Sequence, residues 1–154
     1  MRSRDTRLAL PVVGVLLLAG GGAGCGVPPP PATKTPTLTQ DVAPLFQASC
    51  GFGASCHGTA QPAGLVRLTL DADYDAAALL ARLKGKSTRE PSLALVNPGD
   101  TASSFLWHKV TGDFTGLPCA ASSCGERMPQ RSTPLAAEDL ALLQQWIQQG
   151  APLD

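Results

Sequence analysis

The sequence predicts an all-α fold, in which a small helical domain carries long irregular loops. Two observations predict it: apolar residues recur at helical spacing in four separate segments, and loops rich in turn-forming residues separate those segments. The chain has 154 residues, a length that favours one domain. Only 5% of the residues are aromatic, so the core depends on Leu, Ala and Val. Small domains with such a core usually need a disulfide, a metal or a cofactor.

The first helix is expected between Thr39 and about Ser49. Thr39 can act as its cap, and Pro44 would sit in its early turns, where a missing N–H group matters less. Residues 50–64 then form a glycine-rich loop. The apolar face of this helix consists of Val42, Leu45 and Phe46.

The second helix is expected after a short extended piece at residues 65–70. Asp71 or Asp73 can cap this helix, which runs to about Leu83, and Gly85 can stop it. Its inward residues are Leu79, Leu80 and Leu83.

Two further helices are expected toward the C-terminus. A short one covers Ser103 to Val110, where apolar residues again follow helical spacing. Thr133 and Pro134 can open the last helix with a cap and a proline at the first helical position, and Gly150 ends it. The loops at residues 86–100 and 111–132 are long for a compact domain, which is typical of loops that wrap a ligand or carry function. The face of the last helix consists of Leu140, Leu143 and Ile147.

The first 24 residues have the pattern of a bacterial lipoprotein signal peptide. Three arginines precede an apolar run from Leu8 to Ala19, which is too short to span a bilayer comfortably. A Gly/Ala stretch then ends at Cys25, which we expect to carry the lipid; the alternative is an ordinary secretory signal that leaves Cys25 as a free thiol. Residues 25–37 are rich in proline and read as a tether, so the folded domain is expected at 38–154. This places the protein on the periplasmic side of a bacterial membrane, most simply the outer membrane.

Charge excludes two classes of partner. The 12 basic and 12 acidic residues cancel, whereas a nucleic-acid binder needs a basic stripe and a membrane-surface protein needs a polybasic patch. We therefore expect contact with a membrane only through the N-terminal lipid.

The segment from Cys50 to Gly58 carries the most chemical information. His57 directly follows Cys56, the adjacency found where thiols attach haem covalently and the neighbouring imidazole binds the iron. Five residues separate Cys50 from Cys56, where two are usual, so the intervening loop must bulge. The residues alone leave a second interpretation open, in which a Cys50–Cys56 disulfide closes a small loop and His57 is merely exposed.

Other sulfur and imidazole groups complete the set of candidate ligands. Met128 precedes a proline in an irregular loop, and a thioether is a common second axial ligand of electron-carrying haem; it can equally be a methionine that fills a gap. His108 is the alternative sixth ligand. Cys119 and Cys124 are interpreted as a disulfide that stiffens the Met128 loop.

The order of these motifs resembles the cytochrome c-like domains of exported and lipid-anchored bacterial proteins of the myxobacterial and planctomycete type. The resemblance covers residues 38–153. In that family the first and last helices cross and pack beside the haem, and axial ligands come from the His after the second Cys and from the Met before the last helix. The motifs are Val42, Leu45 and Phe46; Cys50 with Cys56-His57-Gly58; Pro98-Gly99-Asp100; Ser104 to Val110 with Gly112; Met128-Pro129; and Leu143, Trp146, Ile147 and Gly150-Ala151.

The resemblance implies a haem c-binding electron carrier that is not an enzyme. It implies one covalent haem c, with Cys50 and Cys56 as thioether residues and His57 and Met128 as axial ligands, and a redox partner protein of unknown identity. Two other functions stay open: a haem-free, disulfide-stapled structural or binding lipoprotein with the same fold, and a redox sensor or copper-handling protein that uses His57, Met128 and thiols.

Overall fold

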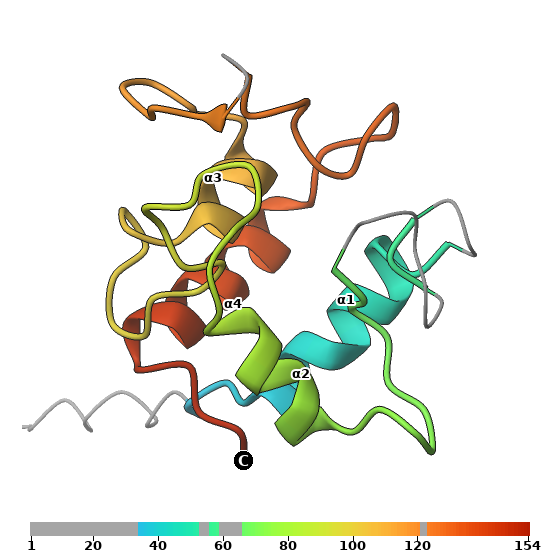
Figure 1. The fold of residues 1–154 in the computed structure, drawn as a ribbon. Helices are drawn as coiled ribbons and strands as arrows, with labels where there is room; N and C mark the ends of the chain where they lie inside the picture. The colour runs from blue at the N-terminus through green and yellow to red at the C-terminus, as the bar shows by residue number, and fades with distance from the viewer. Residues whose placement is uncertain (1–33, 53–55, 59–65, 121–122) are drawn as a thin grey trace, which may run out of the picture. The chain divides into compact units, whose positions relative to one another are not determined.

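The computed structural model describes residues 34–52, 56–58, 66–120 and 123–154. Residues Thr33–Asp154 form one compact unit. The expected signal peptide, Cys25 and most of the tether lie outside the described residues. Across the described part, the helices are joined by loops and isolated β-bridges without any strand, so the predicted all-α class is confirmed (Figure 1). The elements are η1 (Leu38–Val42), α1 (Ala43–Ser49), α2 (Ala76–Leu83), α3 (Phe105–Thr111) and α4 (Ala137–Gln148).

The first predicted helix is confirmed as η1, one turn of π-helix, continued by α1, but its cap is Thr37 rather than Thr39. The Thr37 hydroxyl accepts a hydrogen bond from the Gln40 amide (3.2 Å), and the Asp41 carboxylate accepts one from the Thr37 amide (2.8 Å). This reciprocal arrangement satisfies two amide groups that a helix start leaves without partners. Thr39 instead donates its hydroxyl hydrogen to the Leu153 carbonyl (2.9 Å), which ties the helix to the C-terminus.

The second helix ends at Leu83 as predicted, but it begins later than expected. Asp75 caps α2 by accepting a hydrogen bond from the Ala78 amide (2.8 Å). Asp71 is used elsewhere, because its carboxylate pairs with Arg67 and accepts from the Asp73 amide (2.9 Å). The extended piece is not a strand over residues 66–70, and Leu65 lies outside the described residues.

The third and fourth helices also form where expected, with shifted starts. Ser104 precedes α3 and is fully buried, and its hydroxyl accepts from the Asn97 amide (2.8 Å) and donates to the Asp100 carbonyl (2.7 Å). The last helix begins at Ala137, so the expected start at Thr133-Pro134 was wrong. Its first turn carries Glu138 and Asp139, whose charges interact favourably with the helix dipole in place of a side-chain cap.

The core forms where the two ends of the domain meet. Residues of η1 contact both α4 and α2. Trp146 of α4 is fully buried, and its indole N–H donates to the Pro152 carbonyl (2.9 Å), which also accepts from the Leu38 amide (2.9 Å). None of the helices in the described part of the chain has the length and apolar character needed to cross a bilayer. The large apolar side chains that are fully buried are Leu38, Val42, Phe46, Leu79, Leu83, Val96, Leu143, Trp146 and Ile147.

Candidate functional site

The segment from Cys50 to His57 begins and ends at neighbouring points of the structure. Cys50 ends α1, where its amide donates to the Phe46 carbonyl (2.8 Å), and its own carbonyl accepts from the His57 amide (3.1 Å). The segment between them therefore closes into a loop, as the wide cysteine spacing requires. Residues 53–55 of this loop lie outside the described residues. The closure brings Cys50 beside the Cys56-His57 pair despite the five intervening residues.

Gly51 makes this closure compatible with the neighbouring chain. A β-carbon at position 51 would lie 2.6 Å from the Thr69 methyl group and 2.8 Å from the Gln47 carbonyl oxygen. Thr69 is itself held, because its hydroxyl donates to the Gly58 carbonyl (2.9 Å). The loop thus packs too closely against residues 66–69 for any side chain at position 51.

The imidazole of His57 is held by one of its two nitrogens. Its Nδ1 lies 2.5 Å from the carbonyl oxygen of Val66. Because a carbonyl oxygen can only accept, Nδ1 carries the hydrogen in the neutral ring, and the lone pair is on Nε2. The Leu68 amide donates to the His57 carbonyl (2.9 Å), so backbone contacts also hold this residue. An Nδ1–H bond to a backbone carbonyl is a usual way of orienting a metal-binding imidazole.

Cys50 is a half-buried thiol. Burial, and to a smaller extent the charge of the Cys56 thiolate, raise the pKa of the Cys50 thiol to about 11. The influence of Cys56 means that the two sulfur groups lie near one another. At neutral pH the Cys50 sulfur therefore keeps its hydrogen, and its reactivity as a nucleophile is low.

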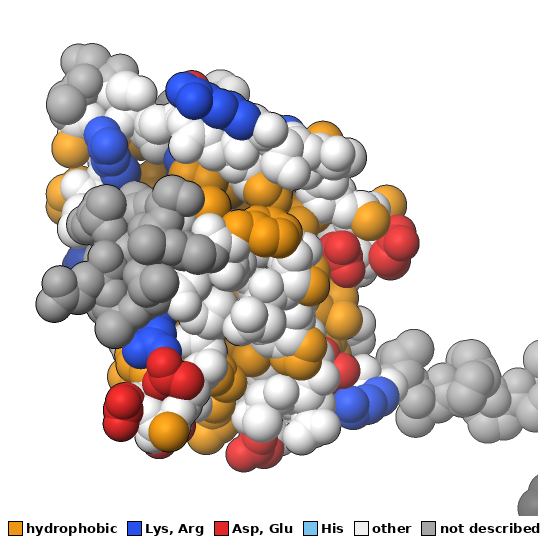
Figure 2. Space-filling model, turned by 90° about the vertical axis from the view of Figure 1, so that its right-hand side faces the viewer, with side chains coloured by type: hydrophobic (Ala, Val, Ile, Leu, Met, Phe, Trp, Pro, Cys, Tyr) orange, Lys and Arg blue, Asp and Glu red, His pale blue; other side chains and the backbone are white. Residues whose placement is uncertain are grey.

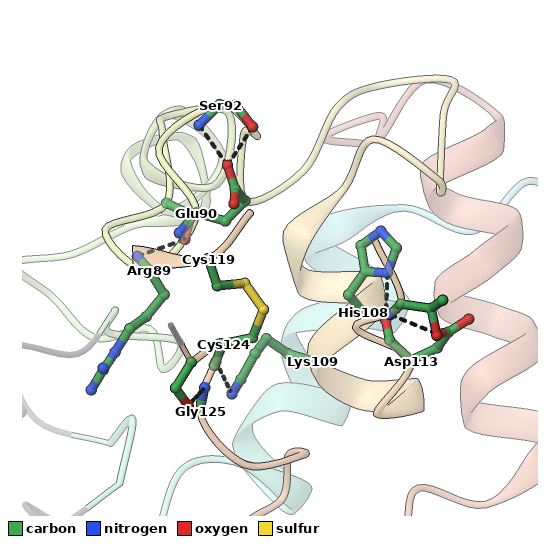
Figure 3. Close-up of a disulfide and its surroundings, with 12 residues drawn as sticks. Arg89, Glu90, Ser92, His108, Lys109, Asp113, Cys119, Cys124 and Gly125 are labelled. Carbon is green, nitrogen blue, oxygen red and sulfur yellow. Dashed lines mark hydrogen bonds between the residues drawn. A yellow bond between two sulfur atoms is a disulfide. The ribbon is translucent and has the colours of Figure 1, made fainter. Parts of the chain in front are cut away.

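Lys109 of α3 holds the loop that contains Met128. The Met128 amide donates to the Lys109 carbonyl (2.6 Å), and the Lys109 ammonium group donates to the carbonyls of Cys124 (3.1 Å) and Glu126. Figure 3 shows this side chain reaching from α3 toward the backbone at Cys124. Burial, followed by the nearby charge of Arg89, lowers the pKa of Lys109, and Glu126 opposes the change.

The predicted Cys119–Cys124 disulfide is present beside this loop (Figure 3), with a Cα–Cα distance of 5.1 Å. Cys124 is buried, and the Ala120 amide donates to the Arg89 carbonyl (2.7 Å). The bridge and Lys109 together fix the chain leading into Met128, which is itself half-buried. The expected Cys119–Cys124 pairing is therefore confirmed, and stiffening of the Met128 loop by it stays a prediction.

A pocket of about 210 Å³ lies between the two loops that carry candidate ligands. Phe52, two residues after Cys50, and Pro129, next to Met128, both line it. Phe52 is 61% exposed, unusually so for a large apolar residue. Figure 2 shows hydrophobic side chains gathered on the face of the molecule that carries α1. The other lining residues are Ala48, Ser49, Ser132, Thr133, Pro134, Leu135, Ala136 and Asp139.

His108 is not available as a ligand in this structure. Its Nδ1 lies 2.7 Å from the Asp113 carbonyl oxygen (Figure 3). Its Nε2 lies 2.8 Å from the carbonyl oxygen of Ala102. Both nitrogens thus face acceptors at the two ends of α3. Pro129, the residue after Met128, lines the pocket beside the Cys50 loop, whereas His108 lines a different pocket.

Several residues that build this site could not be predicted from the sequence. The side chains of Lys109 and Thr69 donate to backbone carbonyls, and Val66 supplies its own backbone carbonyl to His57; every residue type offers such a carbonyl. Within the described ranges, no three His, Cys, Asp or Glu side chains form a group that could hold a metal ion alone. No family model, curated protein or solved structure matches this chain significantly.

Proposed function

We propose that this all-α domain is a haem c-binding electron carrier with a cytochrome c-like fold. The observation that carries the proposal is the His57 imidazole, whose Nδ1 is tied to the Val66 carbonyl while Nε2 keeps a lone pair, in a residue that follows Cys56 and whose amide donates to the Cys50 carbonyl. A thiol pair next to an imidazole oriented in this way suits covalent attachment of haem and ligation of its iron.

Each protein group has one role in this proposal. Cys50 and Cys56 would each add a sulfur to one vinyl carbon of the porphyrin and a hydrogen to the other, so the attachment needs no oxidant. His57 Nε2 and the Met128 thioether would be the two protein ligands of the iron. A bound haem supplies one-electron chemistry, and a Met ligand with a buried site raises the reduction potential.

The pocket is lined by residues that neighbour the candidate ligands in sequence, and none of the four proposed ligand residues lines it. Phe52 and Pro129 line it from the Cys50 side and the Met128 side respectively. Its volume of about 210 Å³ is below the roughly 300–1,000 Å³ typical of ligand pockets. A ligand as large as a porphyrin would therefore extend beyond the pocket, and the exposed ring of Phe52 offers it apolar surface.

The setting of the domain is part of the same proposal. The basic and apolar N-terminus with Cys25 fits export and attachment to a membrane by a lipid, with residues 25–37 as tether. The carrier would exchange electrons with another protein and would have no nucleic-acid partner and no catalytic reaction of its own.

The experiment is a visible spectrum and a redox titration of the protein made in a host with c-type haem attachment. The expected result is a Soret band that stays with the denatured polypeptide and a reversible one-electron transition. Cys50→Ser and Cys56→Ser reveal which sulfurs attach haem, because each loses one thioether. Arg131→Met is a surface control that should leave both readouts unchanged.

A colourless, stably folded protein whose cysteines are all bridged would overturn the proposal. That outcome favours the haem-free, disulfide-stapled lipoprotein, for which the Cys119–Cys124 bridge is the supporting observation.

A further inference from the structure

Both ring nitrogens of His108 in α3 are placed against backbone oxygens. Nδ1 lies 2.7 Å from the Asp113 carbonyl oxygen, and Nε2 lies 2.8 Å from the Ala102 carbonyl oxygen. A carbonyl oxygen only accepts hydrogen bonds, and a ring nitrogen donates one only when it carries a hydrogen. Because the neutral imidazole carries a single such hydrogen, only the doubly protonated imidazolium can make both hydrogen bonds at once.

The two acceptors belong to segments on either side of α3. Ala102 lies in the turn that precedes the helix, and Asp113 follows Gly112, the left-handed residue at its C-terminal end (φ 79°). Figure 3 shows the imidazole extending from the helix to Asp113. Together with Trp107, these residues line a pocket of about 260 Å³. The ring therefore joins the chain before α3 to the chain after it.

The rest of the chain holds the two segments with different firmness. In the turn before α3, the Ser103 hydroxyl donates to the Asp100 carboxylate (2.6 Å), and the buried Ser104 hydroxyl donates to the Asp100 carbonyl (2.7 Å). On the other side, the Asp113 amide makes a long hydrogen bond of 3.4 Å to the Thr111 hydroxyl. The Asp113 segment is thus the one that moves more easily when a contact with the ring is lost.

The charged groups around His108 favour its positively charged form. Hydrogen bonds from Thr115 hold the pKa of the Asp113 carboxyl below its usual range, and the charge of His108 contributes further in the same direction. Asp113 is therefore ionised at the pH values where imidazoles titrate, and its carboxylate attracts an imidazolium. Lys109 and Asp100, the other charged side chains beside the ring, are turned to partners of their own.

We propose that His108 is a pH-dependent hydrogen-bond bridge across α3. In the imidazolium form it holds the Ala102 and Asp113 segments together. When Nδ1 gives its proton to water, the ring keeps its hydrogen bond to the Ala102 carbonyl and releases the Asp113 segment. Histidine is the side chain that ordinarily changes charge between about pH 5 and pH 8, so the bridge would respond to the acidity of the medium. This inference concerns α3 and its flanks and does not depend on bound haem.

The test is a nuclear magnetic resonance titration of the uniformly ¹⁵N-labelled mature protein, kept in the reduced state if it carries haem. The chain has two histidines, so His108→Gln assigns the ring signals. At about pH 5, both ring nitrogens of His108 should carry hydrogens that exchange slowly with water. At about pH 8, the hydrogen should remain on Nε2, and the Asp113 amide should exchange faster after correction for the intrinsic effect of pH.

Urea unfolding provides a second measurement, which a ring that merely titrates in solvent would not affect. A hydrogen bond that only the protonated ring makes contributes stability at low pH, and this stability is lost as the pH rises. The unfolding constant of His108→Gln divided by that of the wild type should therefore be about fivefold larger at about pH 5 than at about pH 8, the equivalent of one net hydrogen bond. Because both proteins have the same carboxylates, the comparison cancels their titration.

Asp113→Asn is the matched control for charge. It removes the carboxylate but keeps the backbone carbonyl, so both slowly exchanging ring hydrogens should persist at about pH 5.

Two results would overturn the proposal. Ring hydrogens of His108 that exchange at about pH 5 as fast as those of a solvent-exposed histidine would show that the double contact is not made. A ratio of unfolding constants that stays the same across the pH range would show that the proton on His108 is not coupled to the fold.

Discussion

The Nδ1 of His57 donates a hydrogen bond to the backbone carbonyl oxygen of Val66 at a distance of 2.5 Å. This contact fixes the neutral tautomer of the ring and its orientation at the point where the chain has just closed back on Cys50. The acceptor is a backbone atom, so no substitution at position 66 removes it. The backbone, rather than another side chain, therefore orients the imidazole that we propose as a ligand.

Met128→Ala should remove the second axial ligand from the haem-loaded protein. We expect the Met-ligand charge-transfer band to vanish and the potential to fall by a sizeable part of the ~0.8 V range that axial ligands control. Absorbance spectra and a redox titration measure both. His108→Gln is the matched control and should keep the band, since both His108 nitrogens face carbonyl oxygens. A band lost in the His108 variant and kept in the Met128 variant would reverse the assignment.

Gly51→Ala should destabilise the Cys50 loop. The new methyl group would come within 2.6 Å of the Thr69 methyl group and 2.8 Å of the Gln47 carbonyl, and overpacking of this kind costs about 1–3 kcal/mol. Urea unfolding of the same haem-free preparation measures the difference. Combining it with Thr69→Ser, which removes the methyl group but keeps the hydroxyl, should recover part of the loss. Equal stability of wild type and Gly51→Ala would show that the loop does not close as described.

Removing the Cys119–Cys124 bridge should cost a moderate amount of stability. The cysteines are separated by 5 positions in the chain, and a closed loop of this length contributes about 2 kcal/mol in the chain-entropy account. The double variant Cys119→Ala, Cys124→Ala should therefore unfold at lower urea while keeping its Met-ligand band, because Lys109 still holds the loop. An unchanged urea midpoint would mean that the bridge adds no constraint to the unfolded chain.

Cys50 should react slowly with an alkylating reagent in the haem-free protein. The pKa of its thiol is raised to about 11 from the ordinary 9.0, because burial disfavours the thiolate. At about pH 8 its thiolate fraction is about 100-fold smaller than that of an ordinary thiol, and the rate should rise about tenfold per pH unit up to about pH 11. Fragment-ion mass spectrometry of iodoacetamide-treated protein measures the rate at Cys50. A rate that levels off near pH 9 would contradict the burial of this sulfur.

Helix positions were predictable because they depend on local apolar spacing, while their starts depend on a choice among several similar residues. Asp71, Asp73 and Asp75 can all cap a helix, and the apolar spacing does not choose among them. In the structure Asp71 pairs with Arg67 and Asp75 caps α2. Thr37 rather than Thr39 caps the first helix. The Thr39 hydroxyl instead donates a hydrogen bond to the backbone carbonyl of Leu153, near the C-terminus.

The chemistry of the candidate site was predictable only where it is local in sequence. Cys56 and His57 are neighbours, and Cys119 and Cys124 are close, so both pairs could be read directly. The contact of Lys109 with the Cys124 carbonyl spans 15 residues and uses a backbone acceptor, which leaves no trace in the sequence. That Nη1 of Arg127 is buried without a hydrogen-bond partner among the described residues likewise becomes visible only after packing is known.

The mass of the mature polypeptide from a host that makes c-type cytochromes tests the central claim most directly. The account predicts a mass equal to that of the processed chain plus one haem, unchanged by denaturation, with the haem on the peptide that contains Cys56. A mass equal to the processed chain without porphyrin, reduced only by the hydrogens lost to disulfides, would contradict it.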